Sequence, residues 1–262
     1  MTLPAERPRI SAFVITKNEA AKIGECLESL AWVDEVVVVD DFSSDATPEI
    51  CRSHGVSLHQ HRFTGFKDQK CHAMNLASHD WVLELDADER VDEEMKLAIL
   101  ALKAEDYAGN DCFAFKRKTR FWGKWIRHGS LYPDYKARFY CRTRGVWSGG
   151  NIHERFIVNG PTRKLAGEIL HPQDLDLMSY FQRTARYADL SAAEYHARGK
   201  RAKWHHVTIR PVATFCTRYL IRLGFLDGVH GFVVAVMGAL GTFMKYMKLY
   251  EIQKNFAAPP PR

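Results

Sequence analysis

Apolar residues alternate between strand-length runs and helix-spaced positions in the N-terminal part of the chain. Strand-length apolar runs occupy residues 10–16, 36–39, 56–59 and 81–85. Segments with apolar side chains at helical spacing lie at residues 19–30, 67–77 and 92–102. The four valines at 36–39 show no polar alternation, which is typical of a central strand covered on both faces. This order predicts an α/β fold over roughly the first hundred residues, with a mostly parallel sheet and helices on both faces.

The pattern changes after Asp111. Residues 112–121 and 135–140 have the pattern of antiparallel strands, and the loop between them is aromatic and basic, so it could cover a site. Beyond His171 the apolar spacing is helical. We therefore expect an α/β domain at residues 1–175 and a C-terminal helical region at residues 176–262.

The composition indicates a globular protein with a basic surface. Hydrophobic residues make up 46% of 262 residues, and 37 Lys and Arg against 31 Asp and Glu give a net charge of +6 and a pI near 9.0. This charge suits nucleotide phosphates, anionic lipid or nucleic acid, and does not choose among them. The six scattered cysteines form no CxxC pair and no secretory leader is visible, so we expect reduced thiols in a cytoplasmic protein.

Two acidic clusters each follow a strand-length apolar run. Asp40 and Asp41 end the valine run, and Asp86 and Asp88 end the run at 81–85. Because ligands of open α/β sheets bind at the carboxyl edge of the strands, both clusters could grip one ligand. The Asp-x-Asp pair could serve a divalent cation and a ribose, since Mg²⁺ or Mn²⁺ takes few protein carboxylates and adds diphosphate oxygens. The alternative is a solvated acidic turn that caps the next helix.

Three segments resemble the nucleotide-site motifs of family 2 glycosyltransferases with the GT-A fold. They are ISAFVITKNEA, VVVVDDFSSDAT and WVLELDADE, in that order and spacing. The resemblance implies that residues 1–175 form a GT-A, Rossmann-like catalytic domain that binds a nucleotide sugar. Lys17 replaces the family's usual tyrosine, so aromatic stacking on the base is not expected at this position. Thr16, Asn18 and Glu19 of the same motif are expected to bind substrate.

The resemblance also implies roles for the acidic clusters. Asp41 would hold the uracil or ribose, Asp86 would lie near the ribose and diphosphate, and Asp88 would bind the metal cofactor, Mg²⁺ or Mn²⁺. His171 has the position of a late histidine that completes the metal or pyrophosphate site in several GT-A enzymes; the alternative is a structural histidine. Arg138 could approach the diphosphate or only pair with an acid.

The helix before the Asp-x-Asp strand carries three further candidates. Gln69, Lys70 and Asn75 resemble a segment of bacterial family members that lines the nucleotide, so we expect them to bind the donor. For Gln69 and Asn75 the alternative is an ordinary polar helix face.

A catalytic base is expected at the end of the sequence Gly149-Gly150-Asn151-Ile152-His153-Glu154. This segment resembles the Val-His-Glu signature of lipopolysaccharide-core members of the family. Glu154 would take the proton of the acceptor hydroxyl, with His153 orienting substrate or diphosphate, and such general-base help is typically worth about a hundred- to ten-thousand-fold in rate. The alternative is that Glu154 pairs with Arg155 or Arg138 on a strand face.

The C-terminal region contains a possible membrane contact. Residues 231–244 are apolar over fourteen positions, short of the about twenty that a spanning helix needs. Basic and aromatic residues on both sides suit a helix that lies in an anionic membrane surface. A helical hairpin packed on the catalytic domain and a dimer interface are the alternatives, and the turn between the helices is expected at Asp227 and Gly228.

These observations and the resemblance together predict an inverting, metal-dependent glycosyltransferase at the cytoplasmic face of the inner membrane. It would move a hexose, glucose from UDP-glucose, onto a lipid-linked saccharide such as lipopolysaccharide inner core; an oligomer is possible. One alternative is transfer to a polyprenyl phosphate or a protein side chain. Another is a catalytically silent protein that binds anionic lipid or nucleic acid. The intact set of acidic residues argues against a pure binding module, so no nucleic-acid partner is expected.

Overall fold

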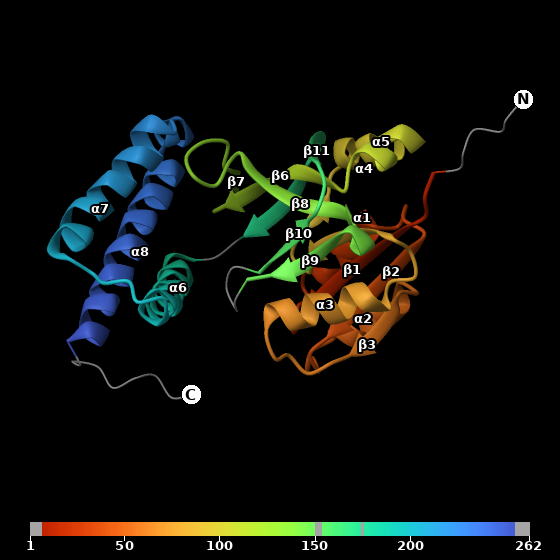
Figure 1. The fold of residues 1–262 in the computed structure, drawn as a ribbon, viewed down its shortest axis with the longest axis horizontal. Helices are drawn as coiled ribbons and strands as arrows, with labels where there is room; N and C mark the ends of the chain where they lie inside the picture. Colours follow the sequence, from red (N-terminus) through yellow and green to blue (C-terminus); the bar gives the residue numbers. More distant parts are fainter. Residues whose placement is uncertain (1–6, 150–153, 174–175, 255–262) are drawn as a thin grey trace, which may run out of the picture. The chain divides into compact units, whose positions relative to one another are not determined.

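A computed structural model describes residues 7–149, 154–173 and 176–254 of the chain (Figure 1). The chain divides into two compact units. The sheet unit consists of Met1–Lys118 and Asp134–Pro172, and the helical unit consists of Thr119–Pro133 and Gln173–Arg262. All six cysteines are free thiols in this structure.

The first half of the sheet unit is parallel. Its strands are β1 (Ile10–Thr16), β2 (Glu35–Asp40), β3 (Ser57–Gln60) and β4 (Trp81–Asp86). They pair in the order β3-β2-β1-β4, with every neighbour parallel. The helices between them are α1 (Ile23–Ser29), α2 (Thr47–Ser53) and α3 (Phe66–Leu76). The predicted α/β fold is therefore confirmed.

The strand registers bring the two acidic clusters to one edge of the sheet. Strand β1 lies between β2 and β4, so that Thr16 is opposite Asp40 on one side and Ile15 is opposite Asp86 on the other. The carboxyl ends of these parallel strands form the edge at which α/β proteins bind ligands. The expectation that both clusters reach this edge is confirmed.

The second half of the sheet unit is antiparallel. Its elements are β5 (Arg90–Val91), α4 (Glu93–Leu100), α5 (Ala104–Gly109), β6 (Cys112–Phe121), β8 (Asp134–Cys141), the 3₁₀ turn η1 (Arg142–Arg144) and β11 (Thr162–Gln173). The sheet continues from β4 in the order β8-β6-β11-β5, and β8 is antiparallel to both β4 and β6. The antiparallel strands predicted after Asp111 are confirmed. Strands β9 (Gly145–Ser148) and β10 (Arg155–Val158) form a separate two-stranded sheet.

Alternation along β4 sorts its side chains onto two faces. Trp81, Leu83 and Leu85 enter the larger core, to which α1, α2, α4 and α5 contribute. Val82 enters the second core, which α3, β9 and β10 help to form. Glu84 and Asp86 have the same parity as Val82, so they lie on the α3 side of the sheet. The strand thus carries two acidic side chains toward α3, and helices cover both faces as predicted.

Among its described residues, the helical unit contains three long helices, two short ones and a strand. They are α6 (Leu177–Ala197), α7 (Trp204–Cys216), η2 (Thr217–Ile221), η3 (Gly224–Asp227), α8 (Val229–Gln253) and β7 (Lys124–Trp125), which pairs with the end of β6. Helix α8 packs along both α6 and α7 (Figure 1). The predicted turn between helices is present, and Gly228 adopts a positive φ of 64° immediately before α8.

Helix α8 is longer than its apolar segment. It has 25 residues, because it continues past Met244 to Gln253 with Tyr246 and Leu249 buried against neighbouring elements. Within the part of the chain that the structure describes, it is the one helix long and apolar enough to cross a membrane, with a mean hydropathy of 1.4 in its most apolar window. Core helices of soluble proteins pass the same test of length and composition.

Candidate active site

A buried carboxylate, Glu84, lies at the centre of the candidate site. It accepts hydrogen bonds from Lys70 Nζ at 2.8 Å and from the Tyr140 hydroxyl at 3.1 Å, and Arg138 Nη1 also donates to it. A buried carboxylate is tolerated only when such partners replace water. Burial, together with the charge of Glu84, raises the pKa of Tyr140 well above its ordinary value, so the phenol remains a donor.

Arg138 bridges three carboxylates at the end of β4. Its Nη2 donates to Asp86 Oδ2 at 2.7 Å and to Glu89 Oε2 at 2.8 Å, while its Nη1 serves Glu84. Burial acts to raise the pKa of Asp86, but the cations of Arg138 and Lys70 outweigh it and hold that pKa far below its usual range. Arg138 therefore pairs with acids, and its contact with a diphosphate stays a prediction.

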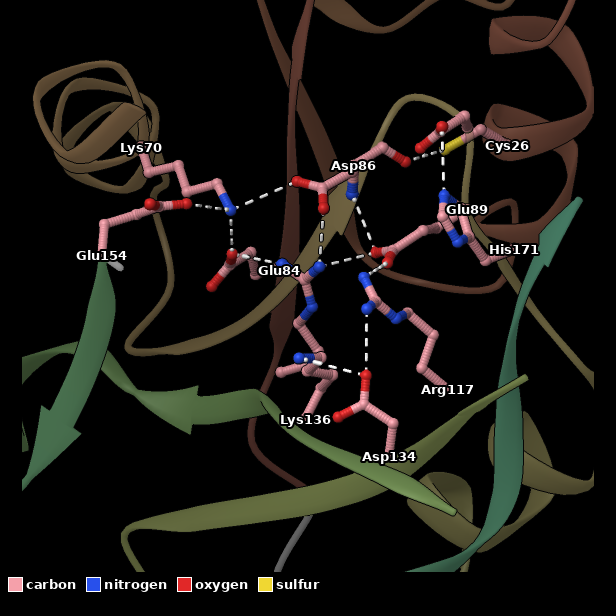
Figure 2. A network of polar contacts seen from close by, with 12 residues as sticks. Cys26, Lys70, Glu84, Asp86, Glu89, Arg117, Asp134, Lys136, Glu154 and His171 are labelled. Atoms are coloured by element: carbon pink, nitrogen blue, oxygen red, sulfur yellow. Dashed lines mark hydrogen bonds and ion pairs between the residues drawn. The ribbon is translucent and has the colours of Figure 1, made fainter. Parts of the chain in front are cut away.

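Lys70 joins this group to Glu154. Figure 2 shows its ammonium, which extends from α3, between the carboxylates of Glu84, Asp86 and Glu154. The distances from Nζ to these three groups are 2.8, 3.2 and 3.5 Å. Burial acts to lower the pKa of Lys70, but Asp86 and Glu84 outweigh it and raise the pKa, so the lysine is charged. One cation thus links the strand end to the expected base.

Glu154 lies immediately before β10, with 14% of its side chain exposed. Among the described residues its ion-pair partner is Lys70, and not Arg155 or Arg138 as the alternative supposed. The other expected catalytic residue, His153, lies outside the described residues. The role of Glu154 as the base stays a prediction.

The buried network carries more negative than positive charge. Three cations meet four carboxylates, namely Lys70, Arg117 and Arg138 with Glu84, Asp86, Glu89 and Glu154. The chain of ion pairs continues from Arg117 to Asp134 at 2.9 Å (Figure 2). A site with this charge would repel a diphosphate unless a cation accompanied it.

Asp88 and His171 form the candidate metal pair. His171 Nε2 lies 3.2 Å from Asp88 Oδ2. Burial acts to raise the pKa of Asp88, but the hydrogen bond with His171 outweighs it, so the pKa is lowered and the carboxylate is ionised. Two neighbouring ligands of an octahedral cation, each about 2.1 Å from it, would be about 3 Å apart, which fits this spacing.

The protein would supply few of the metal ligands. Over the described ranges, no group of three or more His, Cys, Asp or Glu side chains has the geometry of a metal site. Mg²⁺ is usually held by one or two carboxylates together with substrate phosphates, so a two-residue site suits a cation that arrives with a diphosphate. Metal binding by Asp88 and His171 stays a prediction.

Asp40 and Asp41, the acidic cluster at the end of β2, have different surroundings. Asp41 accepts a hydrogen bond from Lys17 Nζ at 2.5 Å and from the amide of Phe63 at 3.0 Å, and these bonds lower its pKa. Asp40 is fully buried and accepts hydrogen bonds from the amide and hydroxyl of Ser43. Asp40 therefore stabilises the turn, whereas Asp41 is the carboxylate that remains near the surface.

The loop after β1 contains three more expected substrate residues. Thr16 Oγ1 is buried and has no hydrogen-bond partner within the described part of the chain, and its contact with a substrate stays a prediction. Asn18 Oδ1 accepts from the amide of Ser44 at 2.8 Å, and the amide of Glu19 donates to Thr47 Oγ1 at 2.9 Å. Asn18 and Glu19 thus hold the loops after β1 and β2 together, and their contact with substrate stays a prediction.

Gln69 and Asn75 lie in different surroundings on α3. Gln69 is almost fully buried, and both ends of its amide bond His61, through Nδ1 at 2.9 Å and the carbonyl at 3.1 Å. Asn75 is exposed, and its side chain contacts Cys71 Sγ at 3.8 Å. Lys70, between them in sequence, is the residue of this segment that joins the network. Donor binding by Gln69 and Asn75 stays a prediction.

The site residues predicted from the sequence did not include Glu84, Glu89, Arg117 or Tyr140. Glu84 carried a usable signal, since it is a charged residue inside the apolar strand WVLELD and shares the parity of Asp86. Arg117 and Tyr140 gave no such signal, because their roles depend on the antiparallel pairing of β6 with β8.

The chain belongs to the family 2 glycosyltransferases: the model of "Glycosyl transferase family 2" matches residues 11–166. It is therefore an enzyme of the inverting type general to this family, and the predicted family and enzyme class are confirmed. Among curated relatives, it is 26% identical to the lipopolysaccharide core biosynthesis glycosyltransferase LpsC of Rhizobium meliloti, over 95% of each chain. It is also 27% identical to an uncharacterized glycosyltransferase of Rickettsia felis, over 93% of this chain and 90% of that one.

Two solved structures are also similar. The structure of S. aureus TarS 1-349 in complex with UDP-GlcNAc has 16% identity, covers 95% of this chain and 92% of that chain, and gives a TM-score of 0.49. Mannosyl-3-phosphoglycerate synthase from Rubrobacter xylanophilus has 17% identity, covers 75% and 77%, and gives a TM-score of 0.46.

Proposed function

We propose that this glycosyltransferase moves glucose from UDP-glucose, with inversion and with a divalent metal, onto a lipid-linked saccharide such as lipopolysaccharide inner core. The acceptor class is supported by the relative named for lipopolysaccharide core biosynthesis, which is similar over 95% of both chains. The observation that carries the mechanism is the position of Lys70 between Asp86, at the expected donor edge, and Glu154, the expected base.

The donor would lie along the carboxyl edge of β1, β2 and β4. Asp41 would accept from the base or ribose, and the free hydroxyl of Thr16 would contact the same nucleoside. The ion pairs with Arg138 and Lys70 would hold the side chain of Asp86 in one orientation, in which it positions the ribose and diphosphate. Asn18, Glu19, Gln69 and Asn75 would shape the pocket around the nucleotide.

The metal would be held by Asp88 and His171. A divalent cation supplies positive charge that stabilises the departing diphosphate. Because the network beside it has an excess of carboxylates, the same charge would also allow the anionic donor to bind.

Glu154 would accept the proton of the attacking hydroxyl. Its side chain keeps 14% exposure, so an acceptor could reach it, and Lys70 Nζ lies 3.5 Å from one of its oxygens. In our proposal the second oxygen takes the proton as the glycosidic bond forms and the bond to the diphosphate breaks. His153 would orient the acceptor or the diphosphate next to it.

Residues 1–175 would form the catalytic domain, and residues 176–262 a helical region at the cytoplasmic face of the inner membrane. The apolar helix α8 and the basic residues around it support this location. A lipid-linked acceptor would then be reached without leaving the bilayer.

The test is metal-dependent hydrolysis of a panel of UDP-, GDP- and ADP-linked hexoses. Wild type should hydrolyse UDP-glucose best, and chelator or Asp88→Asn should abolish that activity. Asp80→Asn is the matched control, because this exposed carboxylate precedes β4 at the opposite end of the strand. Turnover that survives both chelator and Asp88→Asn would refute the metal site, and preference for another donor would refute the assignment of UDP-glucose.

A further inference from the structure

The connection between α7 and α8 exposes a set of large apolar side chains. We call these six residues the apolar tip: Leu220, Ile221, Leu223, Phe225, Leu226 and Val229. All are at least 44% exposed, and Ile221 and Val229 reach 75% and 69%. Soluble proteins seldom expose so many large apolar groups in one short segment, and such patches mark contacts with a partner or a membrane.

The backbone of the tip is tightly held. A Cβ on Gly231 would lie 1.8 Å from the carbonyl oxygen of Gly224, so only glycine allows η3 and α8 to approach this closely. Asp227 is buried and accepts from the amides of Arg127 and His128 at 3.0 and 2.8 Å. The apolar side chains are therefore presented by a built turn and not by a frayed helix end.

The charged side chains beside the tip are basic. From Thr217 to Gly231 the charged residues are Arg218, Arg222 and the buried Asp227, and Lys124 Nζ donates to the carbonyl of Asp227 at 2.9 Å. Arg222 is exposed within the tip itself, and Arg218 precedes it by one helical turn. Any exposed charge along this stretch is positive, which favours an anionic partner.

Three occupants could cover such a surface, and the charges favour one. Symmetric pairing with a second copy would bring the same basic stretch against itself, because the two halves of an isologous interface are identical. A membrane span by α8 would expose to lipid a helix that carries Lys245, Lys248 and Glu251 in its last turns. An anionic bilayer surface satisfies both the apolar and the basic residues.

We propose that the apolar tip inserts shallowly into an anionic lipid surface, with the neighbouring arginines and lysines against the phosphate groups. The tip lies among the headgroups and the first methylenes, and α8 remains packed along α6 and α7. The inference rests on the membrane location in the proposed function, but not on the proposed donor, metal or base. It adds which segment contacts the bilayer and how deeply.

Vesicle flotation of the full-length chain tests this inference. Wild type should float with vesicles of phosphatidylcholine and phosphatidylglycerol, float less at high salt, and stay unbound with phosphatidylcholine alone. The triple variant Leu220→Ser, Ile221→Ser, Leu226→Ser should lose about tenfold or more in partitioning. Leu97→Ser is the matched control, because Leu97 is a 56% exposed leucine on α4 of the sheet unit. It should float as wild type does.

Separate experiments test the role of the basic residues and the depth of insertion into the membrane. Arg222→Gln should weaken binding to anionic vesicles, whereas Arg52→Gln, an exposed arginine of α2, should leave it unchanged. Bound wild type should be released by alkaline carbonate, as a peripheral protein is. The inference would be overturned if wild type and triple variant floated equally, or if bound wild type resisted carbonate. It would also be overturned if wild type formed a dimer and bound no lipid, and the triple variant were a monomer.

Donor hydrolysis in lipid-free buffer, measured on the same samples, separates the two proposals. The triple variant should hydrolyse the donor at the wild-type rate, which also shows that it is folded. Wild type that floats but hydrolyses no nucleotide sugar would refute the proposed function alone. Wild type that hydrolyses but does not float would refute the membrane contact alone.

Discussion

Lys17 Nζ lies 2.5 Å from Asp41 Oδ2, so the carboxylate expected to read the nucleoside is already paired with a cation. The lysine occupies the position of the family's tyrosine. Asp41 also accepts from the amide of Phe63, and together these bonds lower its pKa. Asp41 is a hydrogen-bond acceptor and Lys17 beside it is a donor. This arrangement matches the edge of uracil, where an N–H lies next to a carbonyl.

Replacing Lys17 by methionine should weaken UDP binding by roughly two- to tenfold, the value of one hydrogen bond. The reason is that the ammonium would donate to a base carbonyl while Asp41 accepts the N–H. Calorimetric titration with UDP measures the change. Lys96→Met removes a comparable lysine, paired with Glu93 on α4, and should bind UDP as wild type does. Unchanged affinity in Lys17→Met would show that the lysine only screens Asp41.

Glu84→Gln should destabilise the protein by about 3 kcal/mol, because it leaves two buried cations short of a counter-charge. Lys70 and Arg138 both depend on this carboxylate. Urea unfolding with an unchanged slope measures the loss. Glu49→Gln, at an exposed pair with Arg52, should stay within about 0.5 kcal/mol of wild type. If both variants unfold at the wild-type midpoint, the buried network contributes no stability.

Glu154→Gln should slow transfer by about a hundred- to ten-thousand-fold while UDP affinity stays within about threefold. The glutamine cannot take a proton but retains the shape of the side chain beside Lys70. Transfer to a saccharide acceptor and UDP titration are measured on one preparation. Normal transfer would move the base elsewhere, and loss of both transfer and UDP affinity would instead indicate a structural role for the pair with Lys70.

Glu35 should make stability depend on pH in the acid range. Burial acts to raise its pKa, but hydrogen bonds from Ser11 at 2.5 Å and from the Ser78 amide and hydroxyl, both at 2.7 Å, outweigh it and lower the pKa below the ordinary 4.5. A depressed folded-state pKa gives stability that is present above 4.5 and is lost as the pH falls through the folded-state value.

The free energy of unfolding of wild type and Glu35→Gln should therefore differ near neutral pH and converge in acid. Denaturant titrations from about pH 3 to about pH 7 follow this difference. A gap that stays constant over the whole range would mean that the ionisation of Glu35 contributes nothing and that only its shape matters.

The sequence predicted the strands and the shared edge well, because apolar runs and the helical spacing between them are local signals. Asp41, Asp86 and Asp88 could be placed for the same reason, since each follows such a run. The partner of Asp41 could not be placed, because Lys17 is 24 residues away and meets it only through the pairing of β1 with β2.

The buried network was less accessible from sequence. Arg138 reaches Glu84, 54 residues earlier, because β8 turns antiparallel beside β4. No local pattern encodes that pairing, although Glu84 itself interrupts an apolar strand. Helix α8 extends beyond the apolar run at 231–244, since its last turns bury Tyr246 and Leu249 between polar sequence neighbours and so lack a continuous apolar signal.

The unequal distances from Lys70 Nζ to its three carboxylates bear on the order in which substrates bind. Glu154 is the farthest at 3.5 Å, so a diphosphate arriving next to Asp86 would draw the ammonium away from Glu154 first. The base would then be freed for the acceptor only once the donor is in place. We expect an ordered kinetic mechanism in which UDP inhibits competitively toward the donor, and a random order in initial-rate studies would contradict it. Because Lys70 pairs with both Asp86 and Glu154, binding of the donor would release the base before the acceptor reacts.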